Sequence, residues 1–101
     1  MPKLYEYFGI TLFFYSNEHE PIHVHAKKGE YESKVEFIIE DGNITDIIIS
    51  NIKGYKPLKG KDLNDVKKIV AALSNDIVNK WIEYFVYHKD IKTEVITRKI
   101  K

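Results

Sequence analysis

The sequence predicts an α+β fold in which an antiparallel sheet is followed by one long amphipathic helix. The first half of the chain contains short segments rich in aromatic and β-branched residues, separated by turns, which is typical of a strand meander. In the second half, apolar residues recur at three- and four-residue spacing from Leu63 to Phe85, which indicates a helix with one buried face. We therefore expect about five strands packed against a long C-terminal helix.

The strands are expected in close succession. The second is apolar on both of its faces, which favours a central place in the sheet. The fourth is the clearest, because Glu32, Lys34 and Glu36 alternate with Val35 and Phe37, as in a strand with one solvated face. The five expected strands cover residues 4–8, 10–15, 23–27, 31–40 and 44–50.

Turn and capping residues suggest where these elements end. Asp41-Gly42-Asn43 favours a tight hairpin, and Asp62 could cap the start of the helix. The helix could run unbroken to about Tyr87, or divide near Ser74, which would then cap the second part. The continuous apolar stripe favours one helix. Residues 92–100 alternate weakly and could form a short final edge strand or a tail.

Length and composition limit the class of protein. The chain has 101 residues, which suits a single domain spanning residues 1–101. It has no cysteine, and its apolar runs are far shorter than the ~18 residues of a membrane span, so we expect a cytoplasmic protein with no membrane partner. The net charge is +1 and Arg98 is the sole arginine, so phosphate recognition would depend on lysines.

Titratable residues are concentrated between the second and third expected strands. His19, His23 and His25 fall within seven positions, interleaved with Glu18 and Glu20. Because side chains alternate along a strand, the last two histidines should share one face, ~6.6 Å apart along the strand. This stretch is the first candidate for a functional site.

One hypothesis is a zinc site made by His19, His23 and His25. A pair of histidines on one strand face with a third nearby can hold zinc and leave one position open, while Glu18 or Glu20 orients a ligand. The alternative is structural, with the imidazoles hydrogen-bonded to nearby carboxylates at the end of the sheet. The sequence leaves both open.

A second hypothesis is metal-free acid–base catalysis on RNA. His23 and His25 could straddle a phosphate, one taking a proton from the attacking 2′-hydroxyl and the other protonating the leaving oxygen. Lys27 would lie on the same face and could stabilise the developing charge, and Tyr15 is a nearby donor.

A lysine-rich loop precedes the expected helix and contains one aromatic residue. Such a loop could follow a phosphate backbone, although a solvated surface loop is the more common meaning of this pattern. The candidate nucleic-acid contacts are Lys53, Tyr55, Lys56, Lys59 and Lys61.

The stretch FYSNEHEPIHVHAKKGEYESKVEF is similar to the signature of a bacterial family known as domain of unknown function 4160. The late Trp81-x-x-Tyr84-Phe85 pattern adds to the resemblance, whereas Ile22 stands where a second proline is common in the family. The resemblance implies a poorly characterised protein, often found beside a second small protein, and proposed to form a toxin–antitoxin pair. We therefore expect a toxin-like component with a small protein partner; the alternative is a non-enzymatic metal-binding or partner-binding module.

Overall fold

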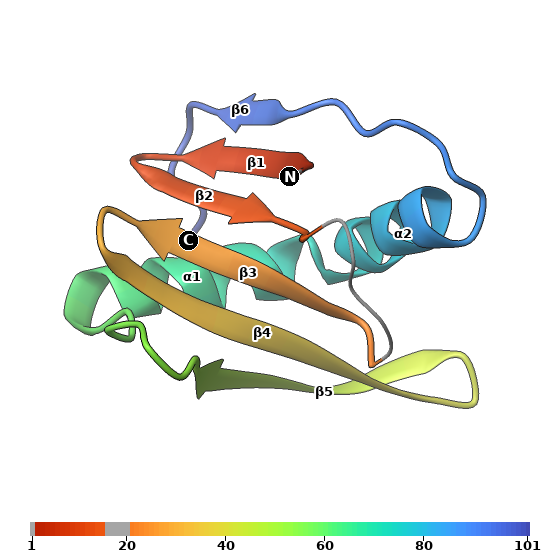
Figure 1. Ribbon diagram of the computed structural model, residues 1–101, viewed down its shortest axis with the longest axis horizontal. Coiled ribbons are helices and arrows are strands. Elements are labelled where there is room, and N and C mark those ends of the chain that lie inside the picture. Colours follow the sequence, from red (N-terminus) through yellow and green to blue (C-terminus); the bar gives the residue numbers. More distant parts are fainter. Residues whose placement is uncertain (1, 16–20) are drawn as a thin grey trace.

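A computed structural model describes residues 2–15 and 21–101 and contains a six-stranded sheet with two helices on one face (Figure 1). The strands and helices are short and follow one another with few intervening residues. In chain order they are β1 (Lys3–Tyr7), β2 (Ile10–Phe13), β3 (His23–Lys28), β4 (Tyr31–Glu40), β5 (Asn43–Asn51), α1 (Gly60–Ala72), α2 (Ser74–Phe85) and β6 (Glu94–Ile96).

The strand order across the sheet is β5-β4-β3-β2-β1-β6. The first five strands pair antiparallel with their sequence neighbours, so the expected meander is correct for them, and β2 lies inside the sheet as predicted. The sixth strand pairs parallel with β1, so the sheet is mixed and the prediction of a purely antiparallel sheet is wrong. The chain leaves α2 near the start of β1 and returns along it in the same direction (Figure 1).

Two helices replace the single long helix that the apolar stripe favoured, as in the alternative with a division near Ser74. Leu73 separates α1 from α2, with φ −110° and ψ 17°, and no side chain caps either helix start, so neither Asp62 nor Ser74 acts as predicted. The prediction failed because one residue outside helical geometry changes the direction of the axis while the stripe keeps its phase. Ile69 and Ile77 are therefore both buried on either side of the break.

The core lies between the helices and the sheet face that they cover. Val24 and Ala26 of β3 belong to it, and Trp81 of α2 is 5% exposed, as expected for a helix residue that faces the sheet. Asp41 and Gly42 adopt positive φ values of 52° and 79°, which form the tight turn between β4 and β5. Within residues 2–15 and 21–101, neither helix has the length and apolar character needed to cross a membrane.

A candidate active site on the uncovered sheet face

The alternation of β3 places His23 and His25 on the sheet face opposite the helices. Val24 and Ala26 are buried in the core, so the histidines between and beside them point to the other side. The two imidazole centroids are 5.3 Å apart, with the rings at 70° to each other. The predicted shared face of this pair is confirmed.

His25 sits among aromatic rings on this face. Its imidazole stacks on Phe13 at 5.5 Å between centroids and meets the edge of Tyr15 at 4.6 Å. Only 7% of His25 is exposed, and Phe13 is fully buried although it faces away from the helices. The sequence signal for the burial of Phe13 was that β2 is apolar on both faces, since such a strand is expected to be buried on both.

Glu32 is the site residue that the sequence pattern misplaced. Alternation predicted a solvated carboxylate, but Glu32 is only 1% exposed. Its Oε2 accepts a hydrogen bond of 2.8 Å from the Tyr15 hydroxyl and lies 3.4 Å from Nδ1 of His25. Alternation gives the face of a side chain but not what covers it. Glu32 is covered by Tyr15, which lies two residues beyond the end of β2, and by His25 of β3.

The surroundings of the Tyr15 hydroxyl, Glu32 included, change its pKa. Burial raises the pKa of Tyr15 above its usual value, and the hydrogen bond to Glu32 and the negative charge of that carboxylate raise it further. A hydrogen bond involving Tyr55 adds to the increase. The lysine-rich loop that carries Tyr55 therefore reaches the histidine site, which the sequence did not predict.

His23 is held by a backbone contact. Its Nδ1 lies 2.8 Å from the carbonyl oxygen of Pro21, which can only accept, so Nδ1 carries the proton. In the neutral ring the basic lone pair is then on Nε2. His23 is partly exposed, whereas His25 is buried, so the two imidazoles differ in access to solvent.

The predicted lysines are distributed unevenly around the site. Lys27 is exposed and shares the histidine face, opposite Thr11 on one side and Glu32 on the other. Lys56 lies 3.3 Å from a carboxylate oxygen of Glu30. The nitrogen of Lys59 lies 5.9 Å from the centroid of the Tyr31 ring. Lys53 is exposed at the start of the loop, and Lys61 is exposed in the first turn of α1.

The three-histidine zinc site stays a prediction. His19, Glu18 and Glu20 lie outside the described residues, so the structure tests only part of the ligand set. Among residues 2–15 and 21–101, no group of three or more His, Cys, Asp or Glu side chains is arranged to hold a metal ion. His23 and His25 alone would provide two of the nitrogen donors that zinc accepts.

Comparison with known proteins gives a family but no relative of established activity. No curated protein and no solved structure matches the chain. The match to a family model begins at Gly9 and ends at Ile82, and it includes the whole histidine stretch and the buried Glu32. The chain belongs to the family described as Domain of unknown function (DUF4160), whose model matches residues 9–82.

Proposed function

We propose that this protein is a small cytoplasmic, metal-independent ribonuclease that acts as the toxin-like component beside a small protein partner. The observation that carries this proposal is the pair of imidazoles whose centroids lie 5.3 Å apart on the sheet face opposite the helices, with His23 partly exposed and His25 buried. With an RNA phosphodiester placed against the edges of both rings, one ring can take the proton of the 2′-hydroxyl and the other can protonate the leaving 5′-oxygen, without a metal ion.

His23 serves as the general base. Its Nδ1 proton is donated to the Pro21 carbonyl, so Nε2 has the lone pair that removes a proton from the RNA 2′-hydroxyl. The 2′-oxygen then attacks the adjacent phosphorus, and the bond from phosphorus to the 5′-oxygen breaks. The products are a 2′,3′-cyclic phosphate and a 5′-hydroxyl once the leaving oxygen has been protonated.

His25 serves as the general acid that protonates the leaving oxygen. The Glu32 carboxylate lies 3.4 Å from Nδ1, where it stabilises an imidazolium ring and fixes its orientation. Nε2, on the other edge of the ring, then carries the proton that is transferred. The Tyr15 hydrogen bond of 2.8 Å holds Glu32 in place for this role.

Lysines supply the positive charge that RNA binding requires. Lys27 lies on the same face and can stabilise the charge that develops on the phosphate. The loop with Lys53, Lys56 and Lys59 is linked to the site through Tyr55, so an RNA strand that follows the loop would pass the histidines.

The test is expression of the protein without its neighbour, combined with cleavage assays on purified protein. We expect wild type to slow growth and to cleave RNA in the presence of EDTA. His23→Ala and His25→Ala should each lose about 10²–10⁴ in cleavage rate. His88→Asn is the control, because His88 is exposed, lies beyond α2 and has a φ of 56°, which asparagine tolerates better than alanine does. A double His23 and His25 variant that folds and still cleaves RNA at the wild-type rate would contradict the proposal.

A non-enzymatic binding module is the second candidate, favoured by the environment of His25. A ring that is 7% exposed and stacked on Phe13 resembles a structural side chain. Under this alternative, wild type cleaves no RNA, and His25→Ala lowers the free energy of unfolding while His23→Ala leaves it nearly unchanged. Retained stability in His25→Ala with loss of cleavage would favour the enzyme instead.

A further inference from the structure

The outer edge of β5 is the long strand edge of this sheet that lacks a neighbouring strand in the described part of the chain. The strand has nine residues, whereas β6 at the opposite edge has three. Nine residues extend about 30 Å, close to the 34 Å longest dimension of the molecule. This length offers a row of backbone groups to a further strand.

The composition of this edge is apolar for an exposed strand. Ile47, Ile48 and Ile49 are consecutive, Ile48 is 44% exposed, and Asp46 is the sole charged residue of the strand. Exposed edges are usually protected by lysine, proline or several charges, because an apolar edge pairs readily with another strand. β5 has neither lysine nor proline.

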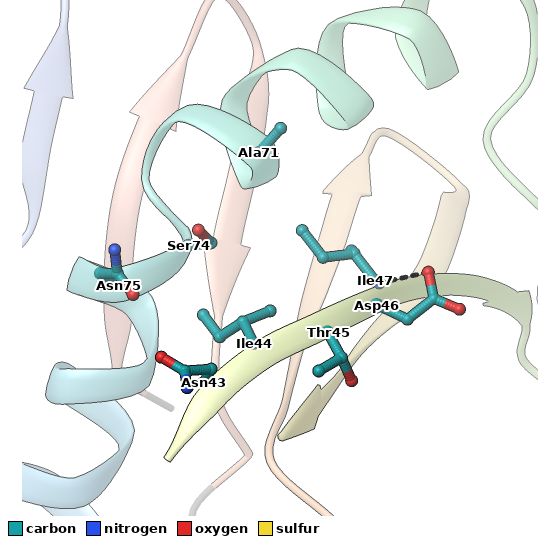
Figure 2. A pocket seen from close by; sticks show the side chains of 8 residues that line it. All are labelled: Asn43, Ile44, Thr45, Asp46, Ile47, Ala71, Ser74 and Asn75. Carbon is teal, nitrogen blue, oxygen red and sulfur yellow. Dashed lines mark hydrogen bonds between the residues drawn. The ribbon is translucent and has the colours of Figure 1, made fainter. Parts of the chain in front are cut away.

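The helices do not fill the space beneath this edge. A hollow of about 590 Å³ lies between the first half of β5 and the junction of α1 and α2, and Ile44 and Ile47 point into it toward Ala71 and Ser74 (Figure 2). A second hollow of about 340 Å³ continues beside Ile49. Side chains of an added strand would fill these hollows and extend the core.

We propose that β5 is the docking edge for a second copy of this chain, paired antiparallel about a two-fold axis at Ile48. In this register Ile48 lies opposite Ile48 of the second copy. Ile47 of each copy lies opposite Ile49 of the other, so all three central pairs consist of two β-branched residues. Asp46 faces Ser50, whose hydroxyl can donate to the carboxylate, and no like charges meet. This self-complementarity is the reason for choosing a second copy over a different partner.

The backbone hydrogen bonds fit the same register. The Ile47 N–H donates to Oδ1 of Asp46 at 2.8 Å, which indicates that this amide points away from β4. Because amide directions alternate along an antiparallel strand, Ile49 also presents its backbone outward. On pairing, the Asp46 carboxylate exchanges this amide for the Ser50 hydroxyl of the second copy, and the backbone groups of Ile47 and Ile49 bond across the two-fold axis.

The first experiment measures the mass of the full chain by sedimentation over a range of concentrations. We expect wild type to approach twice the 11.9 kDa of one chain at high micromolar concentration. Ile48→Lys should be monomeric, because it places two charges against each other at the axis. Val95→Lys is the control and should dimerise as wild type does, since Val95 lies on β6 and is 64% exposed, more than the 44% of Ile48. A wild-type chain that stays monomeric throughout would overturn the proposal.

A cysteine test reports the register directly and does not depend on a disruptive variant. Wild type has no cysteine, so Ile48→Cys carries a single thiol. Residues facing each other between hydrogen-bonded pairs have Cα atoms about 4.5 Å apart, which is within disulfide range. We expect mild oxidation to link Ile48→Cys into dimers much faster than Val95→Cys. Equal rates for the two variants would show that β5 does not pair in this way.

Discussion

Tyr15→Phe tests whether the buried carboxylate of the site is organised as the structure indicates. The substitution removes one hydroxyl and keeps the ring that packs against Phe13 and His25. Glu32, which is 1% exposed, then loses the donor at 2.8 Å, and its burial means that solvent can replace this hydrogen bond only in part. The variant should therefore be less stable than wild type.

The magnitude follows from the type of hydrogen bond. A hydrogen bond to a charged group contributes about 1.5–3 kcal/mol to stability. Tyr15 is half-buried, so part of this contribution is regained from solvent, and the lower end of that range applies. We expect a loss of about 1.5–2 kcal/mol in the free energy of unfolding at about pH 8. Tyr87→Phe should change it by less than ~0.5 kcal/mol, because Tyr87 is 64% exposed.

The difference should also depend on pH in a defined direction. The pKa of Tyr15 is raised in the folded protein by burial and by Glu32. Below the unfolded pKa of about 10, both states keep the proton and the full stability is present. Above it, the unfolded chain loses the proton first, so wild type loses up to about 1.4 kcal/mol per pH unit relative to Tyr15→Phe. Solvent screening at this half-buried hydroxyl reduces the pKa shift, and therefore the pH range over which this stability is lost.

The assay is denaturant unfolding of both proteins at several pH values between about 8 and 11. Other tyrosines and the lysines titrate in both proteins, so the difference isolates Tyr15. Equal stability of wild type and Tyr15→Phe at the lower pH would mean that the hydroxyl does not bond a buried carboxylate. A stability difference that stays constant above pH 10 would contradict the raised pKa.

Two further predictions concern the core and the metal hypothesis. Trp81→Ala should lower the free energy of unfolding by about 3–5 kcal/mol, because Trp81 is 5% exposed. Val95→Ala should have almost no effect, because Val95 is 64% exposed. An equal loss of stability in both variants would refute the packing of α2 on the sheet. Under the zinc hypothesis, calorimetric titration at about pH 7 should show one site in wild type and none in His23→Ala; heat no greater than that of non-specific binding in wild type would leave the metal-free mechanism.

The sequence was sufficient to predict the strands because their patterns are local. The charged and apolar alternation of Tyr31–Glu40 matches β4, and the Asp41-Gly42 turn fixes where the hairpin reverses. The pairing of Glu94–Ile96 with β1 is a contact between the two ends of the chain, and no periodicity encodes it. The helix break at Leu73 lies beside the division near Ser74 that the sequence offered as the alternative, and the stripe favoured one helix because it records which face is buried and not the direction of the axis.

The shared position of the two histidines was predicted, and the residues around them were not. The shared face of His23 and His25 follows from strand geometry alone. The burial of Glu32 and the approach of Tyr55 to Tyr15 depend on segments that are distant in sequence. Alternation could assign Glu32 to the histidine face, but only the packed structure reveals that this face is covered there.

End-group analysis of RNA cut by the purified protein in EDTA tests the His23 and His25 mechanism most directly. We expect fragments that end in a 2′,3′-cyclic phosphate and begin with a 5′-hydroxyl, because the 2′-oxygen is the nucleophile. An oligonucleotide with 2′-deoxyribose on the 5′ side of the scissile phosphate should then resist cleavage at that position. Fragments with 5′-phosphate ends, or cleavage that requires added zinc, would contradict a metal-free pair of histidines.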